Sequence, residues 1–167
     1  AYLCCEVVGV VTAFLIWLRH GRRRGAEGER AWLEANFALQ NWWVRALKWW
    51  AERLFRLTFV VEGDDALPGG GALLILRHCS IGDTLLPVAF YNHTQHRRLR
   101  FVLKRELLFD PCLDIVGNRL PNYFADRSSQ NTAREVEGVK ALLVELPADT
   151  GVLIYPEGTR FSPAKRE

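Results

Sequence analysis

The N-terminal segment of the sequence is apolar, and it limits what the chain can fold into more than any other feature. Residues 2–18 carry a single charge, at Glu6. A helix of this composition must be covered by a protein core or by lipid, and a bilayer span needs about 20 apolar residues, with a lower limit near 17. The segment is therefore interpreted either as a buried core helix or as a membrane anchor.

Basic residues follow this segment at once, and they favour the anchor. The cluster consists of Arg19, His20, Arg22, Arg23 and Arg24. Basic residues beside a hydrophobic segment mark the cytoplasmic side of a membrane, whereas a cleaved signal peptide carries its charges ahead of the apolar run. We expect residues 1–24 to form an anchor with a basic flank. It holds the protein at the cytoplasmic face of a membrane, either by crossing the bilayer or by lying on it.

A long amphipathic helix is predicted for residues 29–57, which contain no Gly or Pro and are rich in Ala, Leu, Glu and Arg. Helical spacing gives one face the apolar set Leu39, Trp42, Trp43, Ala46, Trp50 and Leu54. The opposite face carries Arg45, Lys48, Glu52 and Arg56. This arrangement suits a membrane interface, and it also suits a helix packed on its own domain. We interpret residues 25–56 as a Trp-rich interfacial helix.

The remaining sequence alternates between two kinds of pattern. Strand-like runs occur at residues 57–61, 72–76, 99–103 and 152–155, and helical periodicity occurs at residues 84–91 and 131–146. Strands separated by helices are typical of an α/β fold. The sequence therefore predicts one domain over residues 57–167, with a central, mostly parallel sheet flanked by helices.

Net charge and cysteine spacing together exclude three classes of protein. The formal net charge of +3 is too small for a general nucleic-acid-binding protein, so no nucleic-acid partner is expected. The cysteines Cys4, Cys5, Cys79 and Cys112 form no C-x-x-C pair. Their spacing excludes a zinc knuckle and a disulfide framework.

A first polar cluster begins directly after the strand-like run at residues 72–76. It contains His78 and, five positions later, Asp83. Such a pair can form a relay in which the carboxylate accepts the imidazole N–H and raises the basicity of the other ring nitrogen. The same spacing also fits a surface histidine and a helix-capping aspartate. Cys79 offers an alternative nucleophile, but its side chain and that of His78 point in different directions if they continue the strand.

Two further polar clusters follow apolar runs. The first reads Phe124-Ala125-Asp126-Arg127, and the second runs from Pro156 through Glu157, Gly158 and Thr159 to Arg160. Arginine suits a phosphate because its planar fork donates two parallel hydrogen bonds, and glycine lets backbone N–H groups approach an anion. Each cluster taken alone also fits an ordinary capped helix start or a tight surface turn.

Together and in this order, the three clusters resemble the motifs of the glycerolphosphate and lysophosphatidic acid acyltransferase family. The family's first motif is His, four residues and Asp, matched by His78 and Asp83. Its second leads into Asp-Arg, matched by Asp126 and Arg127, and its third is Pro-Glu-Gly-Thr-Arg, matched at residues 156–160. Residues 101–107 resemble the lysine-bearing segment that precedes the second motif. The family usually has Asn at the position of Arg77 and Gly at the position of Pro121. These departures concern the identity of the acceptor more than the type of reaction.

The resemblance implies an α/β acyltransferase that moves a fatty acyl group from acyl-coenzyme A or acyl carrier protein to a hydroxyl. The implied acceptor is a lysophospholipid, most simply 1-acyl-glycerol-3-phosphate, which would give phosphatidic acid in phospholipid biosynthesis. In this reading His78 is the general base and Asp83 holds it. The residues implied for the acceptor phosphate are Lys104, Arg127 and Arg160, with Glu157, Gly158 and Thr159 shaping the pocket. No cofactor or metal is implied.

Two alternatives remain open from the sequence. One is an acyltransferase with an acceptor other than a glycerophosphate, and the other is a non-catalytic lipid-binding relative. The chain ends seven residues after Arg160. The family's fourth motif, a hydrophobic strand containing Pro, would therefore lie beyond the sequence, and we expect the domain to be incomplete at its C-terminal end. The expected partners are the membrane bilayer, a lysophospholipid and the acyl donor.

Overall fold

The computed structural model describes residues 1–23, 25–60, 62–63, 71–77, 82–92, 97–126, 131–144 and 146–156. For residues 82–84 and 92 it describes the backbone alone. Statements about the fold refer to these residues.

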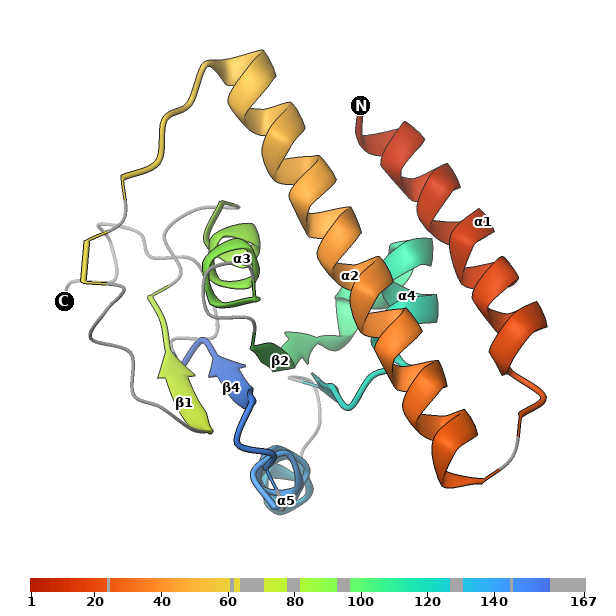
Figure 1. Ribbon diagram of the computed structural model, residues 1–167. Coiled ribbons are helices and arrows are strands. Elements are labelled where there is room, and N and C mark those ends of the chain that lie inside the picture. Colours follow the sequence, from red (N-terminus) through yellow and green to blue (C-terminus); the bar gives the residue numbers. More distant parts are fainter. Residues whose placement is uncertain are drawn as a thin grey trace, which may run out of the picture.

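Two long helices form a hairpin at the N-terminal end of the chain. They are α1 (Tyr2–His20) and α2 (Ala26–Phe55), and they pack side by side (Figure 1). Both helices were predicted from the sequence. By length and composition α1 is able to cross a membrane, and it is the one such helix in the described part of the chain.

A parallel sheet of four strands follows the hairpin. Its strands are β1 (Ala72–Ile75), β2 (Arg98–Lys104), β3 (Tyr123–Ala125) and β4 (Thr150–Ile154), in the spatial order β1-β4-β2-β3. All three strand pairings are parallel. The predicted α/β architecture with a parallel sheet is confirmed.

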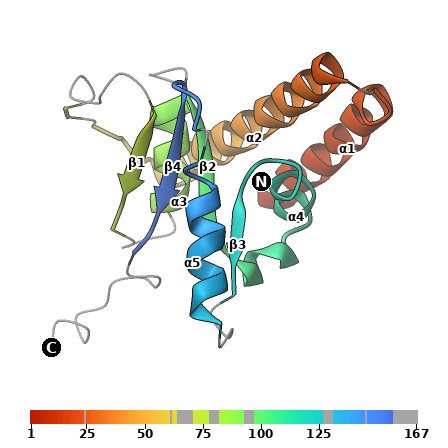
Figure 2. The same cartoon turned by 90° about the horizontal axis from the view of Figure 1, so that it is seen from below.

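Helical segments connect consecutive strands. The β1–β2 connection contains α3 (Gly82–Pro87) and the π-helical turn η2 (Val88–Asn92). The β2–β3 connection contains the 3₁₀ turn η3 (Arg105–Phe109) and α4 (Pro111–Gly117), and α5 (Thr132–Ala141) leads from β3 to β4. Right-handed crossovers in this strand order put α3 and α5 on opposite faces of the sheet, as Figure 1 shows. Seen from below, α4 lies beside β3 and next to the hairpin (Figure 2).

One hydrophobic core joins the sheet to α2 and η2. It contains Val44, Val88, Tyr91, Leu99, Phe101 and Leu153. Leu99 and Leu153 have no exposed surface, which places β2 and β4 at the centre of the domain. β1 is an edge strand, so its outward side chains Leu73 and Ile75 stay more than half exposed while Leu74 packs on the core.

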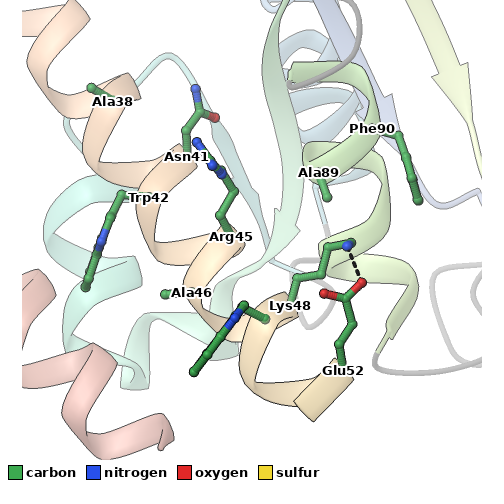
Figure 3. A pocket seen from close by; sticks show the side chains of 10 residues that line it. Ala38, Asn41, Trp42, Arg45, Ala46, Lys48, Glu52, Ala89 and Phe90 are labelled. Carbon is green, nitrogen blue, oxygen red and sulfur yellow. Dashed lines mark hydrogen bonds and ion pairs between the residues drawn. The ribbon is translucent and has the colours of Figure 1, made fainter. Parts of the chain in front are cut away.

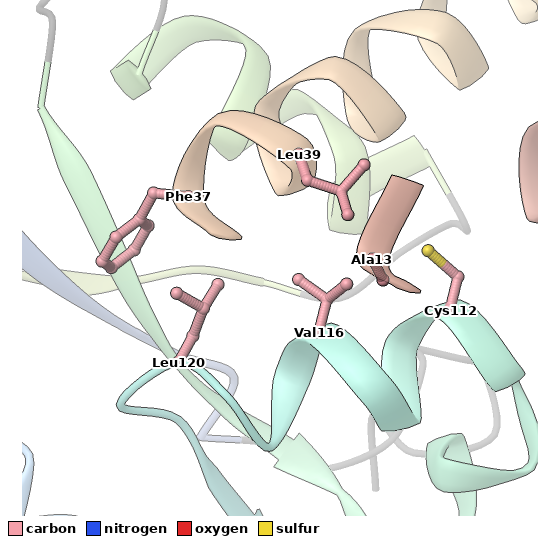
Figure 4. Close-up of a cluster of buried hydrophobic side chains, with 6 residues drawn as sticks. All are labelled: Ala13, Phe37, Leu39, Cys112, Val116 and Leu120. Atoms are coloured by element: carbon pink, nitrogen blue, oxygen red, sulfur yellow. The ribbon is translucent and has the colours of Figure 1, made fainter. Parts of the chain in front are cut away.

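A second core joins the hairpin to α4. It contains Ala13 of α1, Phe37 and Leu39 of α2, and Cys112, Val116 and Leu120 around α4 (Figure 4). Because Ala13 is fully buried in this cluster, α1 is packed against the α/β domain as well as against α2.

Polar contacts reinforce this packing of α1. The Glu6 carboxylate is 7% exposed, and it accepts hydrogen bonds from Trp43 Nε1 at 2.9 Å and from the Cys112 backbone N–H at 3.2 Å. The Tyr2 hydroxyl bonds the Asp110 carboxylate. Further along the helix, Arg119 Nη1 donates to the Ala13 carbonyl oxygen at 2.9 Å. Glu6, the only charged residue of the apolar segment, is therefore buried against α2 and α4.

The predicted apolar face of α2 is only partly correct. Leu39 is buried, but Trp42 is 41% exposed and Leu54 is 60% exposed. The face that packs inside instead contains Asn36, Phe37, Leu39 and Val44. The buried side is set by where α1, α4 and η2 touch the helix, and this information is absent from the spacing of Trp and Leu alone.

The prediction of a strand at residues 57–61 is wrong over residues 57–60. These residues form neither a helix nor a strand, and Leu57 and Val60 are exposed. Arg56 ends α2 in the left-handed conformation with φ 52°. The Phe59 ring then lies 5.2 Å from Lys48 Nζ, so this stretch folds back on α2 instead of joining the sheet.

Helix α5 rests on β3 through two residues and is shorter than predicted. The helix contacts the Tyr123 ring at Gly138, where an added Cβ atom would lie 2.1 Å from Tyr123 Cε2. The Tyr123 hydroxyl donates to Glu135 Oε2 at 3.0 Å. No residue within α5 is buried, and Val136 is 45% exposed, whereas Leu142, just after the helix, is buried at 7% exposure. The predicted apolar face of residues 131–146 therefore reaches the core only near its C-terminal end.

We predict that Glu6→Ala destabilises the fold more than Glu6→Gln. The alanine variant leaves the Trp43 indole and the Cys112 amide without an acceptor, at about 1–3 kcal/mol for each buried group, whereas glutamine keeps one carbonyl oxygen. Thermal unfolding in mild detergent, followed by circular dichroism, measures the difference. Equal losses of stability in the two variants would contradict the assigned hydrogen bonds.

We also predict that Gly138→Ala destabilises the domain by about 1–3 kcal/mol, the usual range for overpacking. The new methyl group has no space beside the Tyr123 ring, which the Glu135 hydrogen bond holds in place. A double-mutant cycle with Tyr123→Leu provides the check, because a smaller side chain at position 123 should restore part of the lost stability. Additive effects would exclude the steric explanation.

Candidate active site

The carboxyl ends of the four parallel strands lie along one edge of the sheet. Ile75 of β1 pairs with Ile154 of β4, Phe101 of β2 pairs with Leu153, and Lys104 pairs with Ala125 of β3. In an α/β sheet, ligands bind outside this edge. Neighbouring strands are about 4.8 Å apart, so the edge extends about 14 Å from β1 to β3.

Each polar cluster of the sequence continues a strand past this edge. The first follows β1, the second follows β3, and the third follows β4. Because β4 lies between β1 and β2, the strand that leads to the third cluster lies between the strands that lead to the other two. In spatial order the strands are β1, which precedes the first cluster, β4, which precedes the third, β2, which ends at Lys104, and β3, which leads into the second.

Most of the predicted site residues lie outside the described residues. These are His78, Arg127, Glu157, Gly158, Thr159 and Arg160. The structure gives only the positions at which the chain reaches and leaves these segments, through Arg77, Asp126 and Pro156. Their side-chain roles remain predictions.

Two predicted site residues belong to described elements. Asp83 is the second residue of α3, and the backbone places it in the first turn of that helix. Lys104 is the last residue of β2, is partly buried, and lies opposite Ala125 at the carboxyl edge. The structure therefore places Lys104 beside the start of the second cluster.

The end of β3 is fixed by two charged residues that the sequence analysis did not single out. Arg105 Nη1 forms an ion pair with Asp126 Oδ2 at 3.0 Å. From α5, Glu135 Oε2 accepts the Asp126 backbone N–H at 3.1 Å and the Tyr123 hydroxyl at 3.0 Å. Burial and the nearby Glu135 carboxylate raise the pKa of Tyr123, so the phenol stays protonated as the donor.

The position of Glu135 explains how it acts on both sides of the second cluster. Asn131 caps α5 by accepting the Arg134 backbone N–H at 3.1 Å, and Glu135 follows in the first turn. Glu135 thus holds Asp126 of the second cluster, while its own helix begins after the cluster. An acidic residue in the first turn of a helix is a common sequence feature, so it gave no signal of this contact.

A cavity of about 510 Å³ opens next to this contact. Its lining includes Arg105, Asp126, Arg134 and Glu135, together with the Tyr123 and Phe124 side chains. Charges of both signs meet here, so the cavity is a polar space beside the second cluster.

A larger cavity of about 790 Å³ lies between α2 and η2. It is lined by Trp42, Arg45, Lys48 and Phe90, among others, and Figure 3 shows the Lys48–Glu52 ion pair at its wall. Of the described residues that line it, none belongs to a strand and none is a predicted site residue.

The described residues give no support to metal or thiol chemistry. Within the described part of the chain, no three His, Cys, Asp or Glu residues are placed to share a metal ion. Burial raises the pKa of the Cys112 thiol to about 12, with Glu6 and Asp110 adding to the shift, so Cys112 stays protonated and acts as a core residue. Cys79 lies outside the described residues.

A comparison with protein families identifies the domain that carries this edge. The family model described as Acyltransferase matches residues 58–166, a stretch that includes all four strands and more than half of the chain. No curated protein and no solved structure matches the chain. Because this family model covers more than half of the chain, the chain belongs to the glycerolphosphate and lysophosphatidic acid acyltransferase family.

Proposed function

We propose that this protein transfers a fatty acyl group from acyl-coenzyme A or acyl carrier protein to the free hydroxyl of a membrane lysophospholipid. The proposed acceptor is 1-acyl-glycerol-3-phosphate, and the product is then phosphatidic acid. The observation that carries the proposal is the carboxyl edge of the sheet, where β1, β4, β2 and β3 lead into the three clusters and Lys104 in an acyltransferase domain.

His78 is the general base of the proposed reaction. One imidazole nitrogen takes the proton of the acceptor hydroxyl while the oxygen attacks the thioester carbonyl carbon. The tetrahedral intermediate then expels the thiolate by breaking the C–S bond, and the thiolate takes the proton from the imidazolium. The products are an ester and a free thiol, and no acyl-enzyme forms.

Asp83 orients His78 in this proposal. It accepts the N–H of the second ring nitrogen, fixes the tautomer and stabilises the imidazolium. Its support in the fold is the short connection between β1 and α3. The strand ends at Ile75, and the first turn of α3 that carries Asp83 begins at Gly82.

The strand order supports a separate subsite for the acceptor phosphate. Lys104 ends β2, whose two neighbours are β4, which leads to Arg160, and β3, which leads to Arg127. Of the three cationic residues, Lys104 ends β2, while Arg127 and Arg160 follow its two neighbours β3 and β4 in the sequence, and His78 follows β1. In 1-acyl-glycerol-3-phosphate the free hydroxyl is on C2, next to the carbon that bears the phosphate, so the two subsites are proposed to be neighbours along this edge. We assign Glu157, Gly158 and Thr159 to the wall between the two subsites.

The polarity of α1 supports a membrane partner. Its buried side contains Glu6, Gly9 and Ala13, whereas the large apolar residues Val7 and Phe14 are more than half exposed. A helix that turns its one charge inward and its apolar side chains outward is suited to lipid, since water would favour the reverse. We place the protein at the cytoplasmic face, next to its lipid substrate and product.

The test of the base is His78→Ala in membranes that contain the full protein. With labelled oleoyl-coenzyme A and lysophosphatidic acid, we expect wild type to form phosphatidic acid and the variant to be slower by about 10²–10⁴-fold. His93→Ala is the matched control, because it removes another histidine that has no assigned role.

The three other outcomes each decide a different point. Donor hydrolysis that depends on His78 but gives no phosphatidic acid would keep the acyltransferase and reject this acceptor. No turnover with either acyl-coenzyme A or acyl carrier protein as the donor would favour a non-catalytic lipid-binding protein. Full activity of His78→Ala would reject the assigned base.

The test of the phosphate subsite compares two acceptors. We expect Lys104→Ala, Arg127→Ala and Arg160→Ala to raise the KM for lysophosphatidic acid more than they lower kcat. Their kcat/KM for monoacylglycerol, which has no phosphate, should change little. Arg45→Ala on α2 is the control for the loss of one positive charge. Equal losses with both acceptors would exclude phosphate recognition by these residues.

A further inference from the structure

We propose that Glu135 of α5 is a positioning residue for the acceptor phosphate, with Arg105 as a weaker assistant. Neither residue belongs to the three clusters. Both act through Asp126, because Glu135 holds its backbone and Arg105 holds its side chain. The inference rests on the phosphate subsite proposed above, and it names the residues that set the affinity of that subsite.

Strand β3 depends on polar contacts to fix where it ends. It has three residues, lies at the edge of the described sheet and pairs with β2 alone. Each of the three is only partly buried. An edge strand at the short end of the usual range gains little from packing. Contacts beyond the last strand pair, Lys104 with Ala125, therefore decide how the chain leaves the sheet.

Glu135 provides the main contact of this kind. Its Oε2 accepts the Asp126 backbone N–H at 3.1 Å and the Tyr123 hydroxyl at 3.0 Å. One carboxylate oxygen thus ties the first residue of β3 and the residue after its last to the same helix. Both bonds are partly shielded from water, and hydrogen bonds to an ionised group are stronger than those between neutral groups.

Arg105 joins the ends of β2 and β3. It directly follows Lys104, and its Nη1 lies 3.0 Å from Asp126 Oδ2. The ion pair therefore closes the space just past the last pair of the two strands. Because the Arg105 side chain is 67% exposed, solvent weakens this pair, and its contribution is smaller than that of Glu135.

These contacts control the two cationic residues proposed for the phosphate at this end of the sheet. Lys104 immediately precedes Arg105, and Arg127 immediately follows Asp126 in the sequence. Holding Asp126 against both β2 and α5 fixes the spacing between the points at which the chain supplies these two cations. Binding groups need support of this kind, because a misplacement of about 1 Å can cost about 10²-fold.

The first experiment measures steady-state kinetics of the full protein with two acceptors. Glu135→Ala should raise the KM for lysophosphatidic acid about tenfold, the usual effect of losing a hydrogen bond to a charged group, and change kcat much less. Glu135→Gln should restore most of the affinity, because one amide oxygen can accept both hydrogen bonds. With monoacylglycerol, which has no phosphate, both variants should keep the kcat/KM of wild type.

Glu137→Ala is the matched control. Glu137 lies on the same helix and lines the same cavity, but its carboxylate pairs with Lys140 at 2.8 Å. Its removal should leave the KM for lysophosphatidic acid unchanged. Tyr123→Phe removes the other bond of Glu135 and keeps the one to Asp126. It should therefore raise KM less than Glu135→Ala does.

A double-mutant cycle tests whether Glu135 and Arg105 act on the same residue. Arg105→Ala alone should raise KM less than about fivefold, as expected for an exposed ion pair. If both act through Asp126, the change in the double variant should differ from the product of the two single changes. A simple product would exclude their joint action.

The second experiment needs no turnover. Lysophosphatidic acid, added in mild detergent without an acyl donor, should raise the Tm of wild type and of Glu135→Gln. It should raise the Tm of Glu135→Ala much less at the same concentration, because a ligand stabilises according to its affinity. Circular dichroism of the free variants checks that both are folded. Monoacylglycerol should stabilise all three proteins equally.

Three results would overturn the proposal. A lower KM in both Glu135 variants would show that the carboxylate only repels the phosphate. Equal losses with lysophosphatidic acid and monoacylglycerol, or a loss in kcat alone, would show a general structural role. An unchanged KM and an unchanged Tm shift in Glu135→Ala would show that the contact has no role in binding.

The two experiments separate this inference from the proposed reaction. A Tm shift that depends on Glu135, in a protein without turnover, would reject the reaction and keep the phosphate subsite. Turnover that depends on His78, with no effect of Glu135→Ala, would keep the reaction and reject the inference. Neither turnover nor a Tm shift in wild type would reject both. In the acceptor test above, Arg45→Ala remains the control, since Arg45 does not contact Asp126.

Discussion

The parallel pairing of β4 with both β1 and β2 is the interaction on which the rest of the structure depends. β4 comes last among the strands, yet it lies inside the sheet, and its Val152 and Leu153 are fully buried. Before β4 is in place, β1 has no partner among the described strands, and the first and third clusters have no common edge. The site is therefore assembled from contacts between segments far apart in the sequence, which are slow to form and cooperative once formed.

The hairpin adds a second constraint, which concerns polarity. The sheet and α2 share a core of ordinary composition, but α1 reverses the usual rule by burying Glu6 and exposing valine, leucine and phenylalanine. Protein contacts satisfy the carboxylate on one side of the helix, and the apolar side chains are exposed on the other. In the proposed membrane-bound state, the same helix takes part both in lipid binding and in the packing of the acyltransferase domain.

The sequence predicted the parts of the fold that local patterns determine. Helices α1 and α2 and strands β1, β2 and β4 follow from hydrophobic periodicity, whereas β3 was not among the predicted strands. It did not predict the buried side of α2, because the contacts of Asn36 and Val44 depend on α1, α4 and η2. Nor did it predict that residues 57–60 leave the sheet. At the site, Glu135 and Arg105 were missed because each acts through a partner that only the tertiary fold brings near.

The close packing of α1 on α4 has a consequence for how such a protein can be rearranged. Gly9 faces Cys112, where a Cβ atom would come within 2.5 Å of the sulfur, and Glu6 is bonded to both α2 and α4. Helix α1 is therefore not an interchangeable module. A generic hydrophobic helix fused in its place would clash at position 9 and leave the indole of Trp43 and the amide of Cys112 unsatisfied. In an engineered protein, the helix and the domain can be exchanged only as a single unit.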